Sequence, residues 1–105
     1  MSMSYIPYMA SVLRHFRGNS PANVTVGATS TSVIAANQDR TYLILTNDSN
    51  EVIYLGLDNA AESNKGIRLA ASGGSVTFAG ETLFKGAVNA ICASGSKVLS
   101  IQEGE

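Results

Sequence analysis

The side chains best suited to acid–base or nucleophilic chemistry are a single histidine, His15, and a single cysteine, Cys92. A general acid or base must be held near a reacting atom, and a cysteine nucleophile needs a base beside it. Arg14 and Arg17 lie close to His15 in the sequence, and cationic neighbours favour the neutral form of an imidazole. Cys92 lies in the apolar run 87–93, which predicts a buried, unreactive thiol. These residues therefore predict no catalytic pair.

One polar stretch carries four oxygen-bearing side chains that calcium could use: Asp58, Asn59, Glu62 and Asn64. Their spacing differs from that of an EF-hand loop, which also needs a bidentate glutamate at its last position. A single cysteine excludes both an intrachain disulfide and a cysteine-based zinc site. We therefore expect a solvated loop, with no metal and no cofactor.

Neither the glycines nor the charges favour binding of nucleotides or nucleic acids. Gly27 and the pair Gly73-Gly74 lack both the lysine and the strand–loop–helix unit of a phosphate-binding loop. The chain has 7 basic and 8 acidic residues and a net charge of −1, without a basic patch. We expect no enzymatic activity and no nucleic-acid partner.

The chain also shows no sign of a membrane segment. No apolar stretch approaches the roughly 18 residues that a membrane span needs. Pro7 and Arg14 interrupt the apolar run near the N-terminus, which does not fit a signal peptide. We therefore expect synthesis in the cytoplasm and no membrane partner.

The N-terminal arm, residues 1–21, differs from the rest of the chain in the spacing of its apolar residues. It has seven large apolar or aromatic side chains within residues 5–16, several of them at helical spacing, which predicts a short helix over about residues 6–17 or else an extended arm. Left uncovered, they would form an apolar patch of a kind that soluble monomers avoid. The arm either folds back on its own domain or reaches a neighbouring subunit. Its residue types, enriched at interfaces, favour the second. The residues expected to bind a partner are Tyr5, Ile6, Tyr8, Met9, Val12, Leu13, Arg14, Phe16 and Arg17.

Beyond Pro21 the pattern changes to short strands separated by turn residues, and we assign residues 22–105 to one body. Strands are expected at 23–27, 30–35, 40–47, 51–57, 67–69, 75–78, 86–93 and 97–101. Seven or eight strands at intervals of about 8 to 12 residues predict an all-β fold, either an antiparallel β-sandwich or a jelly-roll-like small barrel.

The same pattern predicts a core that is light in large side chains. Its expected members are Val24, Val26, Ile34, Leu43, Leu45, Val52, Tyr54, Leu69, Val76, Phe78, Val88, Ile91, Val98 and Ile101. Ordering the backbone costs about 1 to 2 kcal/mol per residue, so such a domain is marginally stable alone. Burial against a partner or further copies would stabilise it.

Several short strand and turn segments of the body together match the pattern of one kind of small domain. They are residues 24–27 (VTVG), 29–31, 34–37 with Arg40, 43–45, 47–49, 52–56, 66–69, 73–74, 86–91 and 94–95. Over about residues 22–102 the body thereby resembles a small domain found widely in structural proteins of tailed bacteriophages and prophages. The resemblance implies a role in the virion and no active site, and it does not cover the arm.

On this resemblance we expect a capsid decoration (cement) protein that binds the major capsid protein shell through its arm. Its location would be the virion, after synthesis in the host cytoplasm, and we expect a homo-oligomer, with a trimer favoured. A head–tail connector or tail subunit, assembled as a ring, is the alternative. A carbohydrate-binding module for host attachment is a third possibility, although the chain has no tryptophan and only Tyr42 and Tyr54 in its body.

Overall fold

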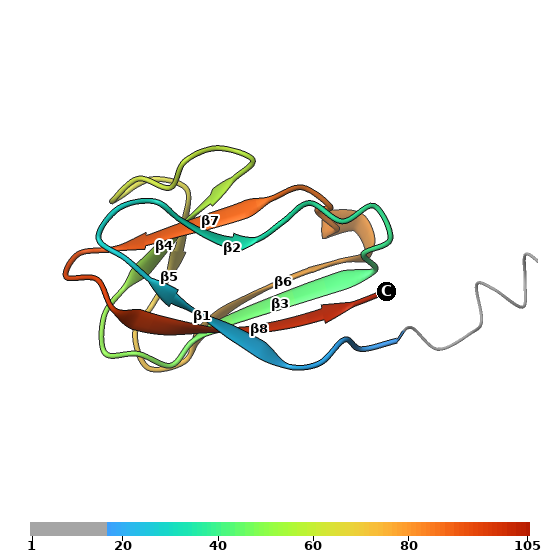
Figure 1. The fold of residues 1–105 in the computed structure, drawn as a ribbon, viewed down its shortest axis with the longest axis horizontal. Coiled ribbons are helices and arrows are strands. Elements are labelled where there is room, and N and C mark those ends of the chain that lie inside the picture. The colour runs from blue at the N-terminus through green and yellow to red at the C-terminus, as the bar shows by residue number, and fades with distance from the viewer. Residues whose placement is uncertain (1–16) are drawn as a thin grey trace, which may run out of the picture.

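Eight antiparallel strands and one short 3-10 turn make up the part of the chain that the computed structural model describes, residues 17–105 (Figure 1). In chain order the elements are β1 (Ala22–Val26), β2 (Thr31–Ile34), β3 (Tyr42–Asn47), β4 (Ile53–Leu57), β5 (Ile67–Leu69), β6 (Gly74–Ala79), η1 (Gly80–Thr82), β7 (Val88–Cys92) and β8 (Lys97–Gly104). Each expected strand is present, which confirms the all-β class.

The strands form two four-stranded sheets that face each other in Figure 1. Sheet A has the order β1-β8-β3-β6, and sheet B has the order β2-β7-β4-β5. Strand β1 pairs with β8, β2 with β7, β3 with β6 and β4 with β5, all antiparallel. The chain is thus one long hairpin rolled around a common core, which is the strand order of an eight-stranded jelly roll.

The hydrophobic core lies between the two sheets. Side chains alternate across each strand, so every second residue points into this space. The buried cluster consists of Val26, Val33, Leu43, Leu45, Ile53, Leu55, Leu69, Phe78, Val88, Ala90, Cys92, Leu99 and Ile101.

In three strands the core predicted from sequence was wrong by one residue. The misplaced residues are Val52, Tyr54, Ile91 and Val98, and their buried neighbours are Ile53, Leu55, Ala90, Cys92 and Leu99. Ile34 is partly buried and packs against the core beside the buried Val33. Val98 is 47% exposed, whereas Leu99 is fully buried. A shift of one residue moves a side chain to the opposite face of its sheet. In β4 and β7 apolar residues occupy consecutive positions, so alternation alone does not identify the inner face.

The described chain begins by pairing with its own C-terminus. The amide of Arg17 donates to the carbonyl of Glu105 (2.8 Å), and the amide of Glu105 donates back to Arg17 (2.7 Å). Gly18 bridges to Gly104, and the amide of Asn19 donates to the carbonyl of Glu103 (2.8 Å). We call residues 17–19 together with 103–105 the junction. It fixes the point from which the N-terminal arm departs.

Candidate interaction surface

Most residues that the sequence predicts to bind a partner lie outside the described part of the chain. This group comprises Tyr5, Ile6, Tyr8, Met9, Val12, Leu13, Arg14 and Phe16, and His15 lies there too. The expected helix or extended arm therefore remains a prediction. Arg17 is described, and it is an exposed residue held through its backbone at the junction.

Cys92 occupies the buried position that its apolar surroundings predict. Its side chain is sealed in the core, and its thiol lies 3.3 Å from the carbonyl oxygen of Val26. The thiol therefore links β7 to β1 and is not presented to a substrate.

The polar loop after β4 is held by internal hydrogen bonds. Asp58 accepts a hydrogen bond from the amide of Ala87 (3.1 Å), and the side-chain amide of Asn59 donates to the carbonyl of Leu57 (3.0 Å). Within residues 17–105, no group of three or more His, Cys, Asp or Glu side chains is placed to hold a metal ion. The oxygens of this loop thus order the chain locally.

A buried arginine organises the end of the sandwich beside the junction. Arg40 is only 1% exposed, and its Nε donates to Glu103 at 2.7 Å. The two terminal nitrogens of Arg40 donate to the carbonyls of Phe84, Gly86 and Ala35 at 2.8, 2.9 and 2.8 Å. A buried charge needs a partner and hydrogen bonds, and Arg40 has a carboxylate partner and a hydrogen bond from each of its three nitrogens. One side chain therefore ties β8 to two loops that are far apart in the sequence.

Glu103 extends this network to the start of the described chain. Besides the guanidinium of Arg40, it accepts hydrogen bonds from the side-chain amides of Asn19 (3.1 Å) and Asn37 (3.2 Å). Because Asn19 belongs to the junction, the exit point of the arm is coupled to a buried ion pair. The local sequence pattern predicts no functional role for Arg40 or Glu103.

The side chain of Tyr42 lies over the glycines of the junction. A Cβ atom on Gly104 would overlap the aromatic ring of Tyr42, and one on Gly18 would lie 3.1 Å from the hydroxyl. The close approach of the Tyr42 ring therefore favours glycine at position 104, whereas a side chain at position 18 would need only a small shift of the hydroxyl.

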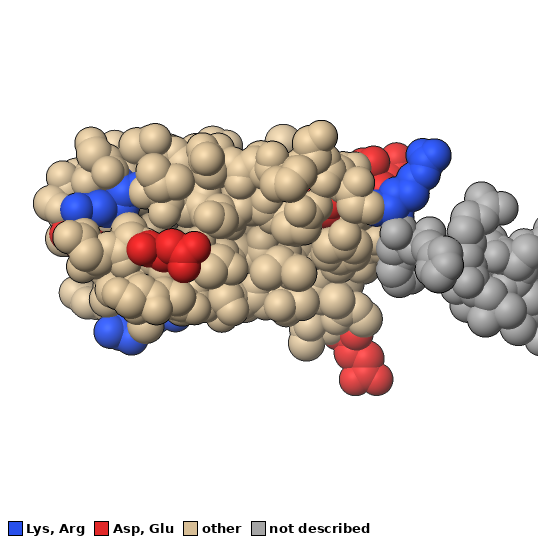
Figure 2. Space-filling model, turned by 90° about the horizontal axis from the view of Figure 1, so that it is seen from below, with Lys and Arg blue, Asp and Glu red and all other residues tan. Residues whose placement is uncertain are grey.

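The outer face of sheet A carries no charged side chain in its strands. The strand register places these residues on it: Asn23, Thr25, Tyr42, Ile44, Thr46, Ser75, Thr77, Ala79, Val98, Ser100 and Gln102. None of them is buried. Figure 2 shows the molecule from the side of this sheet, where one acidic side chain stands within a broad, otherwise uncharged area and the other visible charges lie toward the ends of the body. We call these outward residues the uncharged face of sheet A.

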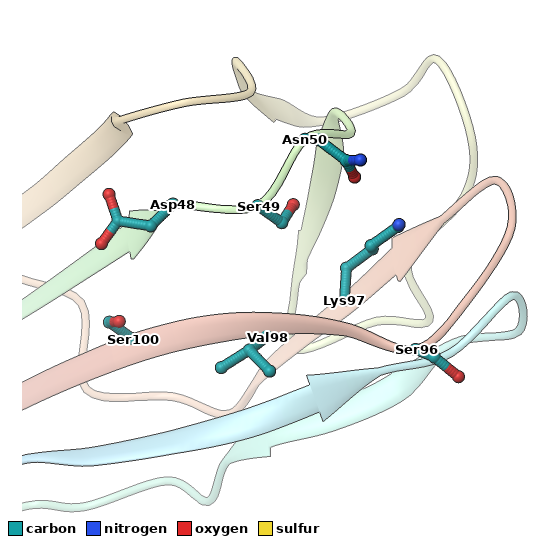
Figure 3. A pocket seen from close by; sticks show the side chains of 7 residues that line it. All are labelled: Asp48, Ser49, Asn50, Ser96, Lys97, Val98 and Ser100. Atoms are coloured by element: carbon teal, nitrogen blue, oxygen red, sulfur yellow. The ribbon is translucent and has the colours of Figure 1, made fainter.

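Two shallow depressions hollow this side of the molecule, with volumes of about 290 and 270 Å³. The first lies between the β3–β4 loop, which contributes Asp48, Ser49 and Asn50, and the start of β8 (Figure 3). The second is lined by parts of β1, β3 and β8 with their flanking residues. Sites that enclose a drug-sized ligand usually measure about 300 to 1,000 Å³ and are deep. These hollows suit side chains of a docking protein better than an enclosed small molecule.

The outer face of sheet B is partly covered by the chain itself. A Cβ on Gly56 would lie 2.8 Å from the carbonyl oxygen of Asn59 and 2.9 Å from that of Ala60, so the loop passes directly over β4. The side-chain amide of Asn89 on β7 also donates to the carbonyl of Asn59 (2.7 Å), and the hydroxyl of Tyr54 donates to Asn64 (3.0 Å). Sheet B thus uses its outer face for its own loop.

One acidic side chain near the first depression, Glu51, has a lowered pKa. Ser94 donates to Glu51 through both its hydroxyl (2.6 Å) and its amide (2.7 Å). These hydrogen bonds, with a smaller contribution from Lys97, hold the pKa of Glu51 below its ordinary value of 4.5. The carboxylate therefore pins the β7–β8 turn to the start of β4.

Comparisons of the chain with protein-family models, curated proteins and solved structures found no match. Among the helices of the described residues, none has the length and apolar character that a membrane crossing requires.

Proposed function

We propose that this chain is a bacteriophage virion protein, a capsid decoration (cement) protein that binds the assembled shell of the major capsid protein through its N-terminal arm. The observation that carries the proposal is the junction. Residues 17–19 are paired with residues 103–105, so the apolar arm begins at a fixed point on an otherwise complete sandwich.

The arm carries the driving force for attachment. Fully burying an apolar side chain contributes about 1.5 to 3 kcal/mol, and residues 5–16 contain seven large apolar or aromatic side chains. Ordering each residue of the arm opposes this by about 1 to 2 kcal/mol. A net gain requires that most of the seven side chains are buried together, as in a groove between capsid subunits.

A fixed exit point favours binding because it lowers the ordering cost. Arg40, Glu103 and Asn19 connect the exit point to the buried end of the sandwich, so residues 17–19, near the end of the arm, are already ordered. Binding only to the assembled shell then stabilises that shell in proportion to RT ln(1 + [L]/Kd), where [L] is the free concentration of this chain.

The fold adds an argument by analogy. Jelly rolls with two Greek keys occur in viral capsid and lectin domains. A fold does not define a function, so this analogy supports a virion role only together with the arm. The uncharged face of sheet A provides a second surface that a neighbouring virion subunit could cover.

The experiment that tests the proposal compares the full chain with a variant lacking residues 1–16. This deletion keeps Arg17 and therefore its backbone pairing with Glu105. Shells assembled from the major capsid protein of the phage that carries this chain are sedimented with each protein. We expect the full chain to sediment with the shells and the deletion variant to stay in the supernatant.

A matched pair of substitutions within the arm separates apolar contact from general disturbance. Leu13→Asp should weaken sedimentation with shells at least tenfold, whereas Ser11→Asp, which adds the same charge, should change it little. Equal binding of the full chain and the deletion variant would remove the arm from the mechanism. Electron microscopy of labelled particles would then distinguish the shell from the head–tail connector or tail.

A glycan-binding function is the second candidate, favoured by the hydroxyl and amide side chains on the outer face of sheet A. Tyr42 is the one aromatic residue in the strands of that face, and its ring is packed against Gly104. Binding of the arm-deleted body to a glycan array would support this candidate over the first.

A further inference from the structure

The two sheets present four edge strands that differ in their protection against pairing with another chain. Proteins protect edges with short strands, charges, prolines or bulges. In sheet B, β5 has three residues with Arg68 at its centre, and β2 has four residues with a register shift between Ser32 and Ile34. Both edges of sheet B are therefore poor sites for strand addition.

The edges of sheet A differ from each other. Strand β1 starts directly after Pro21, and just beyond its end the carbonyl of Gly27 accepts a hydrogen bond from the amide of Cys92 in β7 (3.1 Å). Its own chain therefore closes one end of β1. Strand β6 has six residues, no charge and no proline, and it pairs with β3 without a register shift. Of the four edges, β6 is the longest, and neither a charge nor a proline lies in it or directly before it.

Hydrogen bonds at the end of β6 show which of its backbone groups face outward. The amide of Ala79 donates to the hydroxyl of Thr82 (3.4 Å), and this hydroxyl donates to the carbonyl of Ala79 (2.9 Å). The amide and carbonyl of Ala79 therefore point away from β3. Because the direction alternates along an antiparallel strand, those of Ser75 and Thr77 point away too. No described residue outside β6 hydrogen-bonds to these four groups.

We infer that β6 pairs with β6 of a second copy of this chain, antiparallel about a two-fold axis. With Ser75 opposite Thr77 of the second copy, and Thr77 opposite its Ser75, all four outward backbone groups of each copy are hydrogen-bonded. Val76 then lies opposite Val76 of the second copy.

The side chains of β6 are self-complementary in this register. Ser75 and Thr77 are both exposed, so a hydroxyl of one copy faces a hydroxyl of the other on the outer face. Val76, half-buried at the rim of the core, meets its own counterpart on the inner face. In a two-fold contact each residue pair occurs twice, at symmetric positions. Because the strand is uncharged, no like charges face each other.

The contact uses neither the arm nor the junction. It predicts a dimer of the free protein, in place of the trimer expected from the sequence, and it is independent of shell binding. Joining two copies through β6 would make one continuous eight-stranded sheet with an uncharged outer face.

The test measures the mass of the full chain by sedimentation equilibrium at concentrations up to about 1 mM, the range in which a weak contact of about 4 kcal/mol becomes half-occupied. We expect a concentration-dependent mass approaching twice the 10.9 kDa of one chain. The variant lacking residues 1–16 should dimerise equally. A monomer throughout this range, or loss of the dimer with the arm, would overturn the inference.

A charge exchange tests the register. The double variants Ser75→Lys/Thr77→Lys and Ser75→Glu/Thr77→Glu should each be monomeric, because like charges lie opposite each other. An equimolar mixture should dimerise, because lysine then faces glutamate. Asn23→Lys/Thr25→Lys, with the same spacing on β1, is the control and should dimerise like the wild type.

Circular dichroism melts establish that each variant is folded. Where a double variant unfolds, the single variants Thr77→Lys and Ser75→Glu replace the pair, and their mixture should dimerise more tightly than either alone, because the introduced lysine of one copy faces the introduced glutamate of the other. Dimers formed by the folded double lysine variant alone, or no gain in dimer in the mixture of folded variants, would show that β6 does not pair in this register.

Discussion

Replacing Glu103 with glutamine should remove the charge that neutralises the buried guanidinium of Arg40 while keeping the size of the side chain. The side chain of Arg40 is 0% exposed and that of Glu103 is 12% exposed. Breaking a buried ion pair by removing one partner costs about 3 to 5 kcal/mol, because an uncompensated charge stays buried. Since Glu103 keeps some contact with water, we expect the lower end, about 3 kcal/mol.

This loss is a large fraction of the stability of a small domain, which is typically about 5 to 15 kcal/mol. For a body of this size, 1 kcal/mol corresponds to a fall in Tm of about 4 to 8 °C, so Glu103→Gln should lower the Tm by about 12 to 24 °C. The assay is urea unfolding followed by circular dichroism, with the free energy of unfolding extrapolated to water. Thermal melts provide a second measurement.

The exposed ion pair Lys65–Glu62 supplies a matched control. Its side chains are 71% and 62% exposed and 3.2 Å apart, so Glu62→Gln should change the free energy of unfolding by less than about 1 kcal/mol. The double variant Arg40→Leu/Glu103→Leu should be destabilised less than the sum of its two single variants, because no unpaired charge remains. A Glu103→Gln protein as stable as the Glu62→Gln protein would refute the assignment of the ion pair as the anchor of the junction.

Two more perturbations follow from the contacts described above. The lowered pKa of Glu51 means that its stabilising effect is fully present above its ordinary value of 4.5 and is lost as the pH falls through the lowered value. Urea unfolding from pH 6 to pH 2 should therefore show a smaller loss of stability in Glu51→Gln than in the wild type below about pH 4.5, and identical slopes would contradict this. Gly104→Ala should destabilise the body by about 1 to 3 kcal/mol, because the added methyl group overlaps the ring of Tyr42. Combining it with Tyr42→Ala should remove part of that cost, and additive losses would argue against the contact.

The uncharged face of sheet A could have been anticipated only in part. Thr46, Ser75 and Thr77 alternate visibly with core residues in their strands, so their outward direction follows from local pattern. That they share one surface with Val98 and Ser100 of the last strand depends on the pairing of β3 with β8. This pairing joins segments more than fifty residues apart, and no local pattern encodes it.

Strand positions, turns and the burial of Cys92 were determined by the sequence itself. Each depends on neighbouring residues, because alternation with period two, turn-forming residues and short apolar runs act over a few positions. The inner faces of β4 and β7 and the partners of Arg40 and Glu103 were decided only by the tertiary structure. Where both faces of a strand are apolar, the opposite sheet selects the buried one, and a buried charge finds its partner only when distant segments are brought together by the fold.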